Sequence, residues 1–473
     1  MNKIPFSLAG IVVLLFCAFR LLAVEGQQLS LTIDAPSLAG NLIGEATTQS
    51  IIVYLPPSYS ESTARYPVVY FLPGWTDYVT NWTNGAYQGF RLKTSMDKLI
   101  TDGVCREMIV VIVSGRNFMG GGFYVNSPVT GNWEDFVTQD VIEYMDANYR
   151  TLAVAQSRGI TGHSMGGFGA LNLAMLHPEL FSVVYALSPG LYDTLGLKEA
   201  QVFKSTTLIK TFIQKLDEWA QLDKESALQA FKTFVAGRFS SGDWDGAFGW
   251  AYGTAFSTNI AKPFPHLDYP YTLVNDELQV DSTLWYKYES GFGGVAQEVE
   301  LYKNNLAGLR GLGIDVGTND EYRWISKGCK YMHDLLTAAG IAHDYNTFNG
   351  GHENKVRERI ETMMIPFMSG HLQFEAENSI ESKSVEEYDL RLVNYPNPFN
   401  NATVFQVELS KPGQVSLVVY NLSGQVVDTL ANNYYSQGYY SFPWAAGANA
   451  SGLYIAVLTN RGERVIRKVV LSK

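Results

Sequence analysis

Cysteine is scarce in this chain, and so are excess positive charge and long apolar runs. Only three cysteines occur in 473 residues. They lie at no zinc-type spacing with the histidines, so no metal site is expected. Lys and Arg number 35 against 46 Asp and Glu, a balance that argues against binding nucleic acid through its phosphates. No internal run is long and apolar enough to span a bilayer. What remains is the composition of a folded globular protein, 46% hydrophobic and 17% charged.

The first 26 residues have the layout of a secretory signal peptide. Lys3 is followed by an apolar run to Phe19 and then by the small-residue stretch at 23–26. A membrane anchor is the alternative, but the run is short and is broken by Arg20. We therefore expect export with cleavage of residues 1–26, and we leave this segment out of the fold.

Removal of that segment takes Cys17 with it and leaves Cys105 and Cys329. In an oxidising compartment the two could pair, or each could be a buried thiol in a core. The sequence leaves both readings open.

Strand-like and helix-like segments alternate from about residue 50. Runs rich in Val, Ile and aromatic residues end in Pro or Gly, which is typical of buried strands. Segments with apolar residues at helical spacing lie between them. Near-continuous apolar strands alternating with helices predict an α/β fold with a mostly parallel sheet covered on both faces. The expected strands are 50–57, 66–74, 107–115, 158–162, 181–189, 309–317 and 343–351, and the expected helices are 132–149, 166–178, 321–339 and 355–367.

The pattern divides the chain into an α/β domain at 27–372, a linker at 373–390 and a small all-β, Ig-like sandwich at 391–473. Residues 191–305 interrupt the α/β rhythm. The first half of this insertion looks like two amphipathic helices and the second half is rich in aromatic residues. We expect a lid over a site rather than a mere decoration, because loops at strand ends carry function.

Gly162-His163-Ser164-Met165-Gly166 fits the pattern G-x-S-x-G between a strand and a helix. In that context the pattern predicts a nucleophile elbow, a sharp turn that exposes the hydroxyl of Ser164 above the sheet. Side chains at the two glycines would collide with the neighbouring strand and helix. Ser164 is therefore the candidate nucleophile.

A serine nucleophile needs a base, which we expect on a loop at the same edge of the sheet. His352 lies in such a loop, directly after an expected strand and after Gly350 and Gly351. The other histidines are set aside because they lie in the elbow, in helices, at the start of a strand or in the insertion: His163, His177, His266, His333, His343 and His371.

Two aspartates are candidates for the acid that orients the base. Asp320 lies past the end of an expected strand, on the edge where His352 arrives, and it is preferred. Asp315 lies within the strand and is the alternative. For the oxyanion, the expected donors are the backbone N–H of Met165, at the start of the helix, and of Trp75, in the loop after an earlier strand.

Five segments in order resemble the "putative esterase" family of α/β-hydrolases, over roughly residues 40–370. That family includes feruloyl and acetyl-xylan esterases of carbohydrate esterase family 1, esterase D and the mycolyltransferases. The resemblance implies an α/β-hydrolase fold with Ser164, Asp320 and His352 as the triad and no metal or cofactor. The long aromatic insertion departs from the compact members, which leaves the acyl specificity open. The segments are YFLPGW, NWEDFVTQDVIEYMDANYR, GHSMGGFGAL, GTNDEY and GGHE.

The tail, from NYPNPFN to VIRKVVLSK, is similar to the C-terminal sorting domain of the bacterial type IX secretion system. That resemblance implies a partner in the type IX machinery, passage across the outer membrane and a secreted or cell-surface location. A carbohydrate-binding or spacer sandwich is the alternative.

Together these observations predict a secreted serine carboxylesterase that works through an acyl-enzyme. Feruloyl or acetyl esters of plant polysaccharide are the expected substrates, and the aromatic insertion slightly favours a flat aromatic acyl group. Two rival functions stay open: an acyltransferase of the mycolyltransferase type, and a carbohydrate-binding protein without catalysis.

Overall fold

The computed structural model describes residues 25–289, 291–374, 390–395, 397, 399–400 and 402–472. The expected signal peptide and the expected linker fall almost entirely outside these ranges. Within them, no helix is long and apolar enough to cross a membrane.

An eight-stranded sheet forms the centre of the α/β part, in the order β1-β2-β4-β3-β7-β8-β11-β12. Neighbours from β4 to β12 pair in parallel, whereas β1–β2 and β2–β4 are antiparallel. The expected α/β-hydrolase fold with a mostly parallel sheet is confirmed. The strands are β1 Gln27–Asp34, β2 Thr48–Leu55, β3 Val68–Leu72, β4 Ile109–Val113, β7 Arg158–His163, β8 Val183–Leu187, β11 Gly311–Gly317 and β12 Asp344–Phe348.

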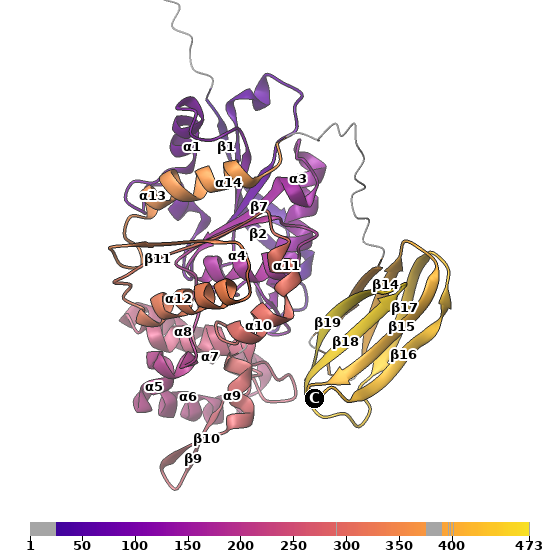
Figure 1. Ribbon diagram of the computed structural model, residues 1–473. Helices are drawn as coiled ribbons and strands as arrows, with labels where there is room; N and C mark the ends of the chain where they lie inside the picture. Colours follow the sequence, from indigo (N-terminus) through magenta and orange to yellow (C-terminus); the bar gives the residue numbers. More distant parts are fainter. Residues whose placement is uncertain are drawn as a thin grey trace, which may run out of the picture.

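Helices cover both faces of this sheet, because the side chains of a buried strand point alternately to either face. In β3, Val68, Tyr70 and Leu72 join one apolar cluster, while Val69 and Phe71 join the other. Figure 1 shows α1, α13 and α14 on one side of the sheet and α4 and α12 on the other. The helices are α1 Leu92–Thr101, α2 Trp133–Asp135, α3 Ile142–Asn148, α4 Met165–Leu176, α12 Arg323–Ala338, α13 Val356–Arg359 and α14 Ile365–His371.

Two helices contain a wider, π-helical turn within a continuous helical stretch. The first joins α2 to α3 through Phe136–Val141, and the second joins α13 to α14 through Ile360–Met364. A short two-stranded ribbon, β5 Asn126–Ser127 with β6 Gly131–Asn132, precedes α2.

The insertion folds around stacked aromatic rings. Phe212 lies parallel to Trp250 with ring centroids 3.8 Å apart, and Trp219 and Phe231 contact the same indole edge-on or tilted. The two expected amphipathic helices are α6 and α7. The elements are α5 Gln201–Lys204, α6 Thr206–Trp219, α7 Lys224–Ser241, α8 Trp244–Phe256, β9 Tyr271–Val274, β10 Glu277–Val280, α9 Ser282–Glu289, α10 Val295–Leu301 and α11 Lys303–Ala307.

Side-chain caps mark the starts of three of these helices. At the start of α6, the hydroxyl of Ser205 accepts a hydrogen bond from the N–H of Leu208. At the start of α7, the carboxylate of Asp223 accepts from two backbone N–H groups. Asp243 does the same for α8 through Gly246. These caps satisfy N–H groups that a helix cannot bond internally.

The C-terminal part is all β, as expected. A three-stranded sheet in the order β13-β14-β17 and a four-stranded sheet in the order β16-β15-β18-β19 enclose an apolar core that includes Phe405, Leu417 and Trp444. The strands are β13 Leu390–Tyr395, β14 Ala402–Leu409, β15 Gly413–Asn421, β16 Val426–Tyr435, β17 Gly438–Ala445, β18 Gly452–Asn460 and β19 Glu463–Leu471.

Cys105 and Cys329 are both free and buried. They belong to the apolar clusters on opposite faces of the sheet. Burial raises the pKa of Cys105 to about 12 and that of Cys329 well above its usual value. The sequence left open either a disulfide or two buried thiols, and the structure has two buried thiols.

Candidate active site

Ser164 forms the turn between β7 and α4. Its backbone has φ 58° and ψ −116°, a left-handed conformation that a residue with a side chain rarely adopts. The turn is held on both sides: the N–H of Ser164 donates to the carbonyl of Leu187 at 2.9 Å, and its carbonyl accepts from Gly190 at 3.1 Å. Strain that is held in place in this way clusters at functional sites.

Gly162 and Gly166 are glycines because backbone fills the space where a side chain would begin. A Cβ on Gly166 would lie 1.8 Å from the carbonyl oxygen of Leu72 in β3. A Cβ on Gly162 would lie 2.4 Å from the carbonyl oxygen of Gly166. The elbow therefore needs both glycines, as the sequence analysis predicted.

Two backbone N–H groups next to the serine are unengaged. Neither Met165 N–H, at the first turn of α4, nor Trp75 N–H, in the loop after β3, donates a hydrogen bond to any described residue. The loop of Trp75 is close by, because a Cβ on Gly74 would lie 3.5 Å from the Cβ of Ser164. Free donors beside a candidate nucleophile such as Ser164 are what a developing oxyanion would require.

The loop that carries Trp75 is fixed by its own contacts. Thr76, at φ 73°, donates its N–H to the carbonyl of Gly120 at 2.9 Å, and the hydroxyl of Tyr124 donates to the carbonyl of Pro73 at 3.0 Å. The indole Nε1 of Trp75 donates to the carbonyl of Met119 at 3.0 Å. The N–H of Trp75 is therefore held in one direction.

Asp77 is a part of this loop that the sequence analysis missed. Its carboxylate accepts from the N–H of Gly74 at 3.0 Å and from the hydroxyl of Tyr87 at 2.6 Å. Burial raises the pKa of Asp77 to about 6, against the lowering effect of these hydrogen bonds. The hydrogen bond of Asp77 back to Gly74 and its burial are features for which the sequence analysis had no signal.

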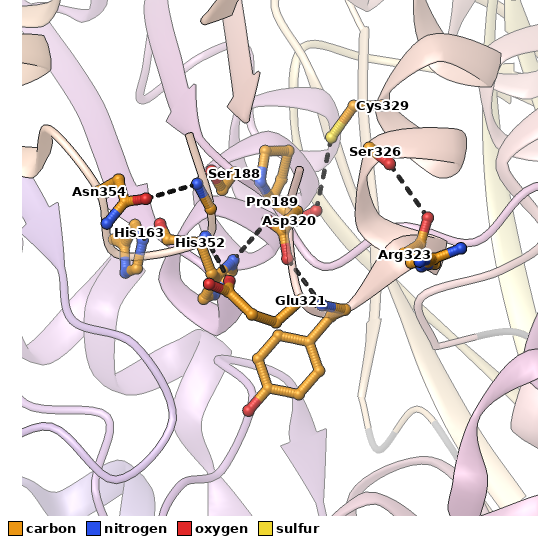
Figure 2. Close-up of polar contacts among 12 residues, drawn as sticks. His163, Ser188, Pro189, Asp320, Glu321, Arg323, Ser326, Cys329, His352 and Asn354 are labelled. Atoms are coloured by element: carbon orange, nitrogen blue, oxygen red, sulfur yellow. Dashed lines mark hydrogen bonds and ion pairs between the residues drawn. The ribbon is translucent and has the colours of Figure 1, made fainter. Parts of the chain in front are cut away.

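His352 and Asp320 form a hydrogen-bonded pair. The Nδ1 of His352 lies 2.8 Å from Oδ2 of Asp320, and the two side chains are 8% and 0% exposed. The other carboxylate oxygen of Asp320 accepts from the N–H of Tyr322 at 2.9 Å. Figure 2 shows the pair at the centre of a set of polar contacts. Because Nδ1 donates to a carboxylate, Nε2 is left free to accept a proton.

Asp315, the alternative acid, is engaged elsewhere. It lies in β11 and forms a buried ion pair with Arg359, whose Nε donates to Oδ2 at 3.2 Å and whose Nη2 donates to Oδ1. The same guanidinium donates to the hydroxyl of Ser188 at 2.9 Å. Within the described residues Asp315 forms no hydrogen bond or ion pair with His352, whose Nδ1 is bonded to Asp320.

The structure brings the serine and histidine segments together through His163. The ring centroids of His163 and His352 lie 4.8 Å apart, and Nε2 of His163 lies 3.1 Å from the carbonyl oxygen of His352. Among the described residues no hydrogen bond runs from Ser164 Oγ itself. Catalytic hydrogen bonds are often long in ligand-free enzymes and shorten when substrate binds.

His163 is buried and uncharged. Burial, reinforced by the nearby His352 and Arg359, holds its pKa well below the usual value. A neutral ring next to a carbonyl oxygen must carry its hydrogen on Nε2 to form that bond. The sequence analysis set His163 aside as the base because it lies in the elbow. Its contact with the backbone of His352 joins residues 189 positions apart, and no local pattern indicates it.

The insertion reaches the same region through aromatic residues. The indole of Trp75 contacts Phe239, Trp244 and Phe248 at centroid distances of 5.7, 6.3 and 5.4 Å. Trp244 is 51% exposed. Beside His352, the ring of Tyr322 is 48% exposed and lies edge-on to the imidazole, with ring centroids 5.2 Å apart. Half-exposed aromatic rings thus lie against Trp75 and against His352.

Comparison with family models places residues 46–356 in the family described as "Putative esterase". This match spans more than half of the chain, and the chain therefore belongs to that family. Residues 393–472 match a second model, the "Secretion system C-terminal sorting domain". Both families are the ones that the sequence motifs resembled.

Two relatives illustrate the similarity. An endo-1,4-beta-xylanase/feruloyl esterase of Xylanibacter ruminicola is 30% identical over 162 residues, which is 33% of this chain and 22% of the relative. An S-formylglutathione hydrolase of Paracoccus denitrificans is 32% identical over 151 residues, which is 30% of this chain and 52% of the relative. The alignments therefore span at most about half the length of either relative.

Solved structures with a similar chain course include a ferulic acid esterase, with TM-score 0.47 and 18% identity, covering 74% of this chain and all of the other. An S-formylglutathione hydrolase of Agrobacterium tumefaciens has TM-score 0.42 and 17% identity, and the match covers 74% of this chain and 97% of the hydrolase chain.

Proposed function

We propose that the protein is a secreted serine carboxylesterase in which Ser164 is the nucleophile, His352 the base and Asp320 the acid. The observation that carries the proposal is the buried hydrogen bond between His352 Nδ1 and Asp320 Oδ2, at the sheet edge where Ser164 forms a strained elbow. Membership of the esterase family supports it. In this arrangement the acid keeps the imidazole in the tautomer that accepts a proton on Nε2.

The proposed reaction has two steps, acylation and deacylation of Ser164. Ser164 Oγ attacks the ester carbonyl while its proton passes to His352 Nε2, and the N–H groups of Met165 and Trp75 stabilise the oxyanion. The C–O bond to the alcohol breaks, the alcohol takes the proton from His352, and an acyl-serine remains. Water then attacks the acyl-serine while its proton passes to His352 Nε2. The bond between the acyl group and Ser164 Oγ breaks, Ser164 Oγ takes the proton back, and the carboxylic acid leaves.

For the substrate we propose feruloyl or acetyl esters of plant polysaccharide. The first relative's name combines a xylanase with a feruloyl esterase. The aromatic residues that contact Trp75, above all the half-exposed Trp244, would suit a flat aromatic acyl group. We also propose that the C-terminal sandwich directs the protein to the type IX machinery, since it matches a sorting-domain model.

The test compares methyl ferulate, acetylated xylan and short p-nitrophenyl esters with the unaltered protein and with Ser164→Ala. We expect hydrolysis of at least one ester class, with kcat lost in Ser164→Ala by on the order of 10⁴-fold or more. Adding alcohols to the assay distinguishes hydrolysis from acyl transfer. Absence of hydrolysis and of transfer on all three classes would contradict the proposal.

A further inference from the structure

His352 is held at its backbone as well as at its ring. Its N–H donates to Oε2 of Glu321 at 2.7 Å, and its carbonyl oxygen accepts from Nε2 of His163 at 3.1 Å. Arg359 approaches the same carbonyl, with Nη1 at 3.4 Å. Figure 2 shows Glu321 and His163 around the base. Each of the two main contacts comes from a sequence neighbour of another proposed triad member, Asp320 or Ser164.

The loop that carries His352 is bonded up to Gly351, since Asn319 donates its N–H to the carbonyl of Gly350 at 3.0 Å and Gly351 donates its N–H to Oδ1 of Asn354 at 2.8 Å. Two glycines precede the histidine, and glycine allows more backbone conformations than any other residue. The ring direction of His352 depends on where this peptide sits, so contacts to its N–H and C=O fix the position of Nε2.

The carboxylate of Glu321 fills the space where a side chain on Gly351, next to His352, would begin. A Cβ on Gly351 would lie 2.2 Å from Oε1 of Glu321. The obstructing atom is the end of a flexible side chain, and the backbone of Gly351 does not have a positive φ. An alanine there is therefore accommodated by moving the Glu321 carboxylate away from the N–H of His352.

We propose that Glu321 and His163 are positioning residues that clamp the backbone of His352 so that its Nε2 faces Ser164. This inference rests on the function proposed above. Neither residue transfers a proton in it: Glu321 accepts from a peptide N–H and neutral His163 donates to a peptide carbonyl. Arg359, which is bonded to Asp315 and Ser188, donates from Nη1 to the same carbonyl oxygen of His352.

The experiment uses Glu321→Ala, Glu321→Gln and Gly351→Ala in the full chain. Glu321→Ala should lower kcat about 10-fold and leave KM within twofold, because the base is misplaced while the substrate contacts remain. Glu321→Gln keeps an oxygen acceptor and should recover most of the lost kcat. Gly351→Ala should reproduce the loss, and combining it with Glu321→Ala should add little, since both remove one contact.

Hydrogen–deuterium exchange of a peptide covering residues 349–355 measures the clamp without any substrate. Exchange at the His352 amide should become faster in Glu321→Ala and Gly351→Ala and stay slow in Glu321→Gln. Unchanged kcat in Glu321→Ala, or an equal loss in Glu321→Gln, would overturn the proposal.

The two proposals can fail separately. If the unaltered protein hydrolyses none of the esters, the proposed function fails, and the exchange rates alone still decide whether Glu321 holds the His352 amide. If the unaltered protein is active and the exchange rates do not change, the clamp fails and the esterase stands.

Discussion

Asp320 Oδ2 lies 2.8 Å from His352 Nδ1, whereas Asp315, five residues earlier in the chain, is bound to Arg359. The two aspartates therefore have different tasks although both lie near the end of β11. One is available to orient an imidazole, and the other neutralises a buried guanidinium. Matching substitutions at the two positions separate these tasks.

Asp320→Asn should lower kcat by on the order of 10³- to 10⁴-fold with a small effect on stability. Asparagine presents an N–H₂ group or a weaker acceptor to His352, which disfavours the tautomer with a free Nε2. Steady-state kinetics on the best ester and thermal unfolding measure both quantities.

Asp315→Asn should instead destabilise the fold by about 3–5 kcal/mol, because it leaves the charge of Arg359 buried without its partner. Denaturant unfolding checks this value. A larger loss of kcat in Asp315→Asn than in Asp320→Asn, measured where both are folded, would reverse the two assignments.

Gly166→Ala should prevent formation of the elbow. The added Cβ would meet the carbonyl oxygen of Leu72, a backbone atom of β3 that cannot move without disturbing the sheet. We expect little soluble folded protein. The matched control is Gly237→Ala in α7, where a Cβ meets nothing within 4 Å and should stabilise by roughly 0.5–1 kcal/mol. Far-UV circular dichroism with thermal unfolding compares the two; equal behaviour would contradict the account.

Asp77 should make stability depend on pH between about 4 and 6. Its pKa is raised to about 6 in the folded protein from an ordinary value of 3.8. In that window the unfolded chain has lost the proton that the folded protein keeps, so this group's contribution to stability falls as pH rises and levels off above pH 6.

Asp77→Asn removes that titration. The Tm of Asp77→Asn minus the Tm of the unaltered protein should therefore increase from pH 4 to pH 6 and then stay constant. A difference that does not vary with pH across this range would show that Asp77 does not titrate there.

Trp244→Ala should discriminate between acyl groups. If its half-exposed indole contacts an aromatic acyl group, its loss should raise KM for methyl ferulate several-fold and leave p-nitrophenyl acetate within twofold. Tyr286→Ala is the control, because Tyr286 is a similarly exposed aromatic residue in α9 of the same insertion. Equal changes for both esters would mean that Trp244 does not select the acyl group.

The thiols should be inert in the folded protein. Cys105 and Cys329 are buried and free, and burial raises the pKa of both, so little thiolate forms. In protein that begins after residue 26, Ellman's reagent at pH 8 should titrate none before unfolding and two after it. Two unreactive cysteines after unfolding without reductant would indicate a disulfide instead.

The buried strands and the elbow could be predicted from the sequence because their signals are local. Apolar runs such as 66–74 mark strands that are covered on both faces, and the glycines around Ser164 mark a turn that has no room for side chains. Asp320 and His352 were found from their places after two strands, since parallel strands bring their ends to one edge.

Other parts could not be predicted because their signals are not local. β1 is a half-exposed edge strand with polar residues, so it carries no buried apolar run. α1, at Leu92–Thr101, lies in a stretch of mixed character that was not read as a helix. The contacts of His163, Glu321 and Arg359 with the backbone of His352 depend on tertiary structure, and no spacing in the sequence indicates them.

The most direct test of the central claim is to find where a fluorophosphonate reacts. The reagent forms a covalent bond with an activated serine, and peptide mass spectrometry then identifies the residue. The account predicts a single adduct on Ser164, lost in Ser164→Ala and formed far more slowly in His352→Ala. An adduct on another serine, or undiminished labelling in His352→Ala, would contradict it.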